Sequence, residues 1–325
     1  MGKGRTAKTR TGDSMKNIIL AAALLFPIHS FAEEAASPVT PTQTESVAPT
    51  SSTATATRPE TESASASPVS TYKTNYFAIN NWPWNKAAQA KFQLSMKFSV
   101  LKPDLYIFNR NYFPAYVAYT QKSLWNIGQP SAPFEESNYN PEVFLEYPVN
   151  RRLGGKIYLR SVTVGLFEHE SNGMAGIQSR SWNRQYIAAK FGLAGDKKFD
   201  VTNSFIQDKA ALYLKLWIPS GYSEQDEYLQ SVGKDTRFLD YMGRGELGLS
   251  VRNFLWGGVM KDHQLDVRLP IFHDTDKPSC QLEFRQQLPN MNFAIYLQYW
   301  YGYGETLLRF DQFGHRGFAG LSFSY

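Results

Sequence analysis

The chain has 325 residues, of which 15% are aromatic, and its formal net charge of +5 includes a basic amino-terminal stretch. The single cysteine, Cys280, excludes a disulfide framework within the chain, and the near balance of charge beyond the amino-terminal stretch gives no indication of nucleic-acid binding. After Ala32 no segment approaches about 18 consecutive apolar residues, which excludes a membrane protein built from spanning helices.

The amino terminus carries the pattern of an export signal. Met15 opens a basic segment, residues 18–25 form a short apolar run, and small residues end at Ala32. This order predicts a secretory signal peptide over residues 15–32. The apolar run is too short to cross a bilayer as a helix. Residues 1–14 are basic and polar, and we interpret them as a vector-derived or mis-assigned extension.

Residues 33–70 are rich in Ser, Thr, Ala, Pro and Glu and lack a repeating apolar pattern. Such a segment cannot bury a core, so we expect a disordered leader. A peptidoglycan-binding or partner-binding tail is the less favoured alternative.

Alternating apolar and polar residues predict β-strands along the rest of the chain. The clearest segments are residues 92–100, 212–218, 247–252 and 265–269. A period of two places the apolar and polar side chains on opposite faces of each strand. Turn residues at 195–198 and 289–292 indicate hairpins between such strands.

The carboxyl terminus favours a membrane barrel over a soluble sandwich. Residues 321–325 alternate and end in the aromatic Tyr325. A terminal aromatic strand on an exported chain resembles the assembly signal of bacterial outer-membrane barrels, and the aromatic excess fits two interfacial girdles. At roughly twenty residues per strand and connection, residues 88–325 hold about twelve strands. We therefore predict an all-β fold, an antiparallel transmembrane β-barrel over residues 71–325, with a secreted β-sandwich as the weaker alternative.

The strongest chemical signal lies in two runs, Glu-His-Glu-Ser-Asn-Gly at 168–173 and Ser-Arg-Ser-Trp-Asn-Arg at 179–184. His169 and Ser171 are two positions apart, so on a strand they project from the same face. Ester hydrolysis needs a hydroxyl nucleophile beside a base, and a third group that orients the imidazole. Ser171, His169 and Asn183 can fill these catalytic roles, with Asn183 acting from the neighbouring strand.

These runs resemble outer-membrane phospholipase A, a family that carries His-Asp-Ser-Asn-Gly and Ser-Arg-Ser-Trp-Asn-Arg with the same His-to-Asn separation of 14 positions. Further matching segments lie at 119–123, 133–134, 138–139 and 302–305. The resemblance runs from about Thr74 to the end, with an apparent insertion between Ser220 and Asp240. It implies calcium-dependent hydrolysis of phospholipid acyl esters, of the phospholipase A1/A2 and lysophospholipase type, in the bacterial outer membrane.

The resemblance also implies roles for other residues. The backbone amide of Gly173 would stabilise the oxyanion. The Ser179 hydroxyl, the Met174 carbonyl and Ser131 of a second subunit would bind Ca²⁺, and Gln121 would pair across the interface of an active homodimer. The alternatives are ordinary loop hydroxyls for the two serines and a lumen-facing side chain for Gln121.

Two positions depart from the family pattern. Gly176 stands where the better-known members carry Asp, and Glu170 replaces the Asp of His-Asp-Ser. The loss of a carboxylate near the metal predicts weaker calcium binding. Both departures support an alternative function, a non-catalytic outer-membrane barrel, porin-like or structural, with a decayed site.

The sequence gives conflicting predictions for the face that the catalytic residues occupy. On the strand through Val162 the apolar residues take even positions, which turns His169 and its neighbour inward. On the next strand Asn183 shares its parity with the apolar Ile187, which turns it outward. The resemblance implies an outward site near the outer leaflet. A β-bulge between Leu166 and His169 would reconcile the two strands.

Overall fold

The structure is a computed structural model that describes residues 69–80, 88–100, 106–107, 110–111, 114–193, 208–255 and 262–323. The expected extension, signal peptide and most of the leader lie outside the described residues, as does the hairpin expected at 195–198. The first described strand, β1 (Val69–Thr71), begins at Val69.

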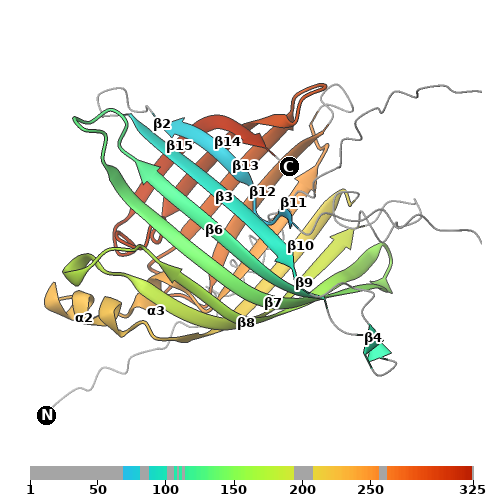
Figure 1. The fold of residues 1–325 in the computed structure, drawn as a ribbon, viewed down its shortest axis with the longest axis horizontal. Helices are drawn as coiled ribbons and strands as arrows, with labels where there is room; N and C mark the ends of the chain where they lie inside the picture. Colours follow the sequence, from blue (N-terminus) through green and yellow to red (C-terminus); the bar gives the residue numbers. More distant parts are fainter. Residues whose placement is uncertain are drawn as a thin grey trace, which may run out of the picture.

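Twelve antiparallel strands close into a barrel, which confirms the predicted fold (Figure 1). They are β2 (Asn75–Asn80), β3 (Gln89–Ser99), β6 (Ala115–Trp125), β7 (Phe134–Gly154), β8 (Ile157–Ser171), β9 (Ser181–Leu193), β10 (Ala210–Ser220), β11 (Gly245–Arg252), β12 (His263–Ile271), β13 (Ser279–Gln287), β14 (Phe293–Gly302) and β15 (Gly314–Phe323). Each of these strands pairs with the next one in the chain, including β3 with β6. The ring closes where the last strand, β15, pairs with the first, β2.

Two short features add to this ring. Strand β1 pairs with residues 96–98 of β3, beyond the stretch of β3 that pairs with β2. Strands β4 (Tyr106–Ile107) and β5 (Arg110–Asn111) form a separate two-stranded sheet. The segments predicted at 212–218, 247–252 and 265–269 fall within β10, β11 and β12, the segment at 92–100 overlaps β3 up to its end at Ser99, and the turn expected at 289–292 joins β13 to β14. No helix in the described ranges is long and apolar enough to cross a membrane.

The barrel is apolar outside and polar inside. On β14 the outward residues Phe293, Ile295, Leu297, Tyr299 and Tyr301 are each between 41% and 46% exposed, whereas the alternate residues between them are mostly buried. Buried carboxylates and ammonium groups line the interior, among them Glu142, Glu168 and Lys91. A water-soluble sandwich would bury its apolar face, so this inverted arrangement fits a lipid-facing barrel and excludes the soluble alternative.

The insertion after β10 forms two helices, α2 (Ser223–Ser231) and α3 (Phe238–Met242), at one end of the barrel (Figure 1). Leu229 of α2 and Phe238 of α3 pack in a buried cluster with Trp182 of β9. The rings of Trp182 and Phe238 meet edge to face at a centroid distance of 5.2 Å. The insertion is therefore fixed to the strand that carries Asn183 by a small apolar core of its own.

A β-bulge in β8 reverses the facing of its side chains. Against β9, Gly165 pairs with Tyr186 whereas Glu168 pairs with Arg184, so β8 holds one residue more than its neighbour. The pairing of β8 with β7 shifts at the same place. Leu166 and the next residue, Phe167, are both exposed on the outside. The extra residue resolves the conflict between the two strands, because odd-numbered side chains beyond the bulge face outward.

Gly165 makes room for a buried ring beside the bulge, and its replacement by alanine should destabilise the barrel. A Cβ at Gly165 would lie 2.1 Å from Cε1 of Tyr186. We expect Gly165→Ala to lower the free energy of unfolding by about 1–3 kcal/mol, the usual cost of overpacking. Denaturant unfolding in detergent micelles measures it. Gly154→Ala is the matched control, because a Cβ at Gly154 meets nothing within 4 Å. Equal losses in both variants would contradict this account.

Candidate active site

His169 and Asn183 stand opposite each other on β8 and β9. Nδ1 of His169 lies 2.7 Å from Oδ1 of Asn183. An amide oxygen only accepts, so the Nδ1–H of the imidazole donates, and this tautomer leaves the Nε2 lone pair free to take a proton. Because Asn183 carries no charge, it orients the ring but stabilises an imidazolium less than a carboxylate would.

Ser171 follows on the same outward face at the end of β8. Its register partners are Tyr139 on β7 and Ser181 on β9. Within the described part of the chain no hydrogen bond joins the Ser171 hydroxyl to His169. Such contacts between a nucleophile and its base are often longer in enzymes without substrate than in the reacting complex. The structure thus brings the three sequence-predicted catalytic residues onto one patch of the outer surface.

Asn140, which the sequence reasoning missed, holds the backbone at His169. Tyr139 pairs with Ser171 and Glu142 with Glu168, so Pro141 falls opposite His169 between these pairs, and proline has no N–H to donate. The side chain of Asn140 supplies the donor instead, with its Nδ2 2.7 Å from the carbonyl oxygen of His169. The signal in the sequence is a proline inside a strand with an amide residue directly before it, Asn140 before Pro141.

Asn172 fixes the loop that follows Ser171. Its Oδ1 accepts hydrogen bonds from the backbone N–H of Met174 at 3.2 Å and of Arg180 at 3.0 Å. Its Nδ2 donates to the carbonyl of Gln178 at 2.8 Å. The sequence showed this residue only as part of a motif, whereas the structure gives it a role, since its side chain closes the loop that carries the remaining predicted site residues.

Gly173 occupies a conformation that requires glycine. Its φ is +65°, and a Cβ there would lie 2.8 Å from the ring of Tyr139. Among the described residues its N–H makes no hydrogen bond. A backbone amide held two residues beyond Ser171 with its donor unused fits the predicted role at the oxyanion.

The predicted calcium ligands lie on two loops. Met174 and Ser179 share the loop closed by Asn172, and the Ser179 hydroxyl donates to Oε2 of Glu224 at 3.2 Å. Ser131 is exposed on the connection between β6 and β7. The described residues contain no cluster of three or more His, Cys, Asp or Glu side chains suited to a metal. Hydroxyl, carbonyl and single carboxylate oxygens, completed by water, fit Ca²⁺ better than a transition metal.

Gln121 lies on the outer face of β6, and the lumen-facing alternative is wrong. Its neighbours Thr120 and Lys122 line the interior cavity. In register, Gln121 pairs with Tyr139, and Tyr139 pairs with Ser171. The predicted interface residue and the predicted nucleophile therefore lie in one outward row, separated by a single strand.

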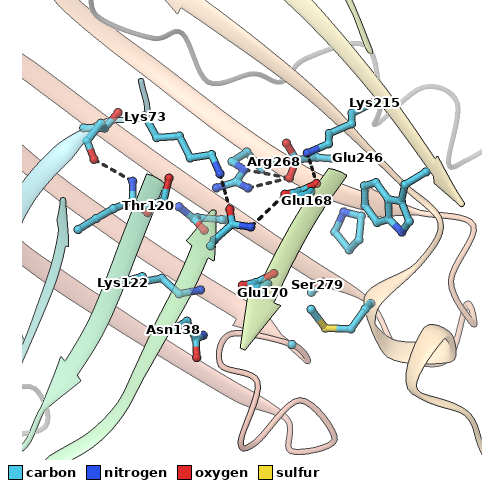
Figure 2. Close-up of a pocket in the computed structure, with 18 of the residues that line it drawn as sticks. Lys73, Thr120, Lys122, Asn138, Glu168, Glu170, Lys215, Glu246, Arg268 and Ser279 are labelled. Carbon is cyan, nitrogen blue, oxygen red and sulfur yellow. Dashed lines mark hydrogen bonds and ion pairs between the residues drawn. The ribbon is translucent and has the colours of Figure 1, made fainter. Parts of the chain in front are cut away.

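The even-numbered neighbours of the predicted catalytic residues on β8, Glu168 and Glu170, point the other way, into the lumen (Figure 2). Glu168 makes ion pairs with Arg184 at 2.7 Å and with Lys215 at 2.8 Å, and Glu170 is 3.0 Å from Arg184. Glu170 also accepts from the indole N–H of Trp182. The replacement of Asp by Glu at position 170 therefore changes the lumen network and removes no carboxylate from the outward site.

Comparison with known proteins gives a consistent result. The family model described as phospholipase A1 matches residues 52–323. The chain is 36% identical to phospholipase A1 of Proteus vulgaris over 255 residues, which covers 74% of this chain and 72% of that protein. It is 36% identical to phospholipase A1 of Salmonella typhimurium over 127 residues, 36% of this chain and 40% of that protein. The chain thus spans about two fifths of the length of some curated relatives it matches.

Solved structures share the fold. Outer membrane phospholipase A from Escherichia coli aligns with a TM-score of 0.60 at 23% identity, over 78% of this chain and 90% of that chain. The outer membrane phospholipase dimer of Salmonella typhi, solved with bound calcium, aligns with a TM-score of 0.61 at 22% identity, over 80% and 93% of the two chains.

Proposed function

The chain belongs to the phospholipase A1 family, and from this we propose that it hydrolyses the acyl esters of phospholipids and lysophospholipids with Ser171 as the nucleophile. Its barrel fold and family assign it to the bacterial outer membrane. The observation that carries the proposal is the 2.7 Å contact between His169 and Asn183, beside Ser171 on the lipid-facing surface.

The geometry supports a two-step acyl transfer. Nε2 of His169 takes the hydroxyl proton while Oγ of Ser171 bonds to the acyl carbonyl carbon. The backbone N–H of Gly173 donates to the oxygen that becomes negative. When the ester C–O bond breaks, the imidazolium returns the proton to the departing alcohol. A water molecule, deprotonated by His169, then attacks the acyl-enzyme and releases the fatty acid and free Ser171.

The outward position of the site sets how substrate arrives. Phe167 and Leu166 are exposed beside His169, and the Phe167 and His169 rings stack at a centroid distance of 6.5 Å. A phospholipid in the adjacent leaflet reaches this face by lateral movement, with its acyl chains against the apolar side chains. The lumen, crossed by ion pairs on the opposite face of the strands, plays no part in this approach.

Calcium and a second copy of the chain complete the proposal. We infer that Ser179, the Met174 carbonyl and Ser131 of the partner subunit hold Ca²⁺. The ion, when bound, supplies positive charge and ordered water near the developing oxyanion. The Salmonella typhi structure is a dimer with bound calcium, which supports this reading. So does the outward row that joins Gln121 to Ser171 through Tyr139, because a partner docked on Gln121 lies one strand from the nucleophile.

A serine-directed sulfonyl fluoride tests the proposal on the purified, folded chain in detergent, with and without Ca²⁺. We expect covalent labelling at Ser171 by peptide mapping, faster with Ca²⁺, together with phospholipid hydrolysis that the label abolishes. Sedimentation of the same samples reports whether the dimer forms. Conductance through the chain without calcium-dependent ester hydrolysis, and without a label at Ser171, would favour the passive barrel instead.

Replacement of Asn183 should slow the reaction without removing it. Asn183→Ala leaves the nucleophile and base in place but frees the His169 ring to adopt the wrong tautomer and orientation. We expect kcat to fall about 10²-fold, the lower end of what a positioned base contributes. Asn183→Asp keeps an acceptor oxygen at the same place and should retain more activity than the alanine variant. Equal rates for the two variants would argue against an orienting role for Asn183.

A further inference from the structure

Lys73 reaches the strand pair that carries His169 from inside the barrel. It stands between β1 and β2 and lines the lumen cavity (Figure 2). Its backbone N–H donates to Oγ of Ser95 on β3 at 3.1 Å, which fixes where the side chain starts. Its Nζ lies 2.8 Å from Oδ1 of Asn140 and 2.7 Å from Oε1 of Glu142, both on β7. A cation from the segment between β1 and β2 therefore meets the residue that holds the His169 backbone.

The contact with Lys73 determines which way the Asn140 amide points. An ammonium group only donates, so the amide oxygen must face it, and the amide nitrogen then faces the carbonyl oxygen of His169 at 2.7 Å. In the opposite orientation the amide N–H₂ would face the ammonium and the amide oxygen would face the carbonyl oxygen, so both hydrogen bonds would be lost. The carboxylate of Glu168 favours the same orientation, but its Oε1 lies farther from the amide nitrogen, at 3.4 Å.

The main chain at His169 depends on this amide because Pro141 opposite it cannot donate. Asn183 orients the ring from β9, whereas Asn140 holds the carbonyl from β7. On the basis of the proposed function, we propose that Lys73 is a positioning residue for the hydrolysis, which acts through Asn140 on the placement of the base. A small displacement between a base and its nucleophile costs much of the rate that their alignment provides. Lys73 therefore acts on kcat from the lumen and leaves the binding of lipid on the outer face unchanged.

The test compares kcat for lumen lysine variants of the full-length chain in detergent with Ca²⁺. Each rate is divided by the number of sites that a sulfonyl fluoride labels at Ser171 when the reaction has run to completion, so misfolded protein does not count. Lys73→Met should lower kcat about 10-fold and change KM less than about twofold, because alignment and not lipid binding is lost. Lys73→Arg keeps a cationic donor and should recover most of kcat.

The matched control is Lys190→Met. Lys190 lines the same cavity, and its Nζ lies 2.8 Å from Oε1 of Glu146, so the variant also removes a lumen ammonium from an ion pair. It should change kcat less than about twofold, as expected of a site with no shared partner. If Lys73→Met has the same kcat per labelled site as Lys190→Met, the inference is overturned and the proposed hydrolase still stands.

A double-mutant cycle tests the route through Asn140. Asn140→Ala should lower kcat by about the same factor as Lys73→Met, and the two changes together should lower it no further, because one contact acts through the other. An unchanged kcat in Asn140→Ala overturns the inference even if Lys73→Met does not fold, and so does a second loss of about 10-fold in the double variant. An unmodified chain that neither takes the label at Ser171 nor hydrolyses phospholipid would instead overturn the proposed function, so the two failures are distinguishable.

Discussion

Ser171→Ala should lower phospholipid hydrolysis by about 10⁴-fold or more, because the variant has no oxygen to carry the acyl group. His169 and Gly173 would still bind and polarise the ester, but without a nucleophile they act only on the slow attack of water. In serine hydrolases the nucleophile, the base and the residue that orients the base act as a unit. Removal of the nucleophile alone therefore loses most of the rate enhancement that the three provide together.

Hydrolysis of phospholipid in mixed micelles with Ca²⁺ measures this loss. Ser161→Ala is the control, because Ser161 lies on the same strand but turns into the lumen, where its hydroxyl donates to Glu146 at 3.2 Å. That variant should keep its activity within about threefold, as expected for a hydrogen bond worth about 0.5–1.5 kcal/mol that lies outside the site. Activity retained by Ser171→Ala would eliminate Ser171 as the nucleophile.

Glu168→Gln should cause a large loss of stability. Glu168 is 1% exposed and lies between the guanidinium of Arg184 and the ammonium of Lys215. Removing its charge leaves the buried Lys215 with a neutral acceptor, while Arg184 keeps Glu170 at 3.0 Å as its remaining carboxylate. Breaking a buried pair in this way costs about 3 kcal/mol or more, because Lys215 has lost the charge that offset its desolvation.

Denaturant unfolding in detergent micelles, followed by the heat-modifiable gel mobility, measures the free energy of unfolding. Asp262→Asn provides a matched carboxylate-to-amide control. Asp262 is exposed and its Oδ1 lies 3.9 Å from Arg252, so we expect a change below about 0.5 kcal/mol. If Glu168→Gln unfolds like the control, the lumen must contain enough water to solvate Lys215, and the buried description of this network is wrong.

Much of the fold could be predicted because a period of two is a local property of the chain. Residues 92–99 alternate strictly between apolar and polar side chains and residues 212–218 alternate with aromatic side chains at two positions, and both segments lie within strands of the barrel. The spacing of His169 and Asn183 was equally informative, since two adjacent antiparallel strands of suitable length bring them together. In each case the prediction used only residues near one another in sequence or in one hairpin.

The bulge at Leu166 shows why other features needed the structure. An extra residue does not change the types of residue that make up a strand. In the sequence it shows only because the odd and even positions of one strand predict a different facing from those of the next strand. Which strand is irregular depends on the pairing with both neighbours, and this is a non-local property. The sequence also showed polar positions along the strands without showing which carboxylate meets which cation, so the partners of Glu168 could not be predicted.

The contact between Glu224 and Ser179 has the same character. The sequence indicated an insertion after Ser220, but an insertion in a barrel loop can fold toward any part of the rim. Its direction is set by Trp182 and the buried cluster that joins α2 and α3 to β9. A carboxylate 45 positions after Ser179 is brought to it by packing that no local pattern encodes.

The outward facing of Ser171 and His169 beyond the bulge changes what substrate concentration means for this chain. An enzyme whose cleft opens to water meets its substrate in three dimensions, and its rate follows the molarity in solution. In the reaction proposed above the ester would approach along the membrane plane, so the relevant quantity would be its mole fraction in the leaflet around the barrel. We then expect non-hydrolysable amphiphiles that dilute this surface to lower the rate even when they never occupy the site.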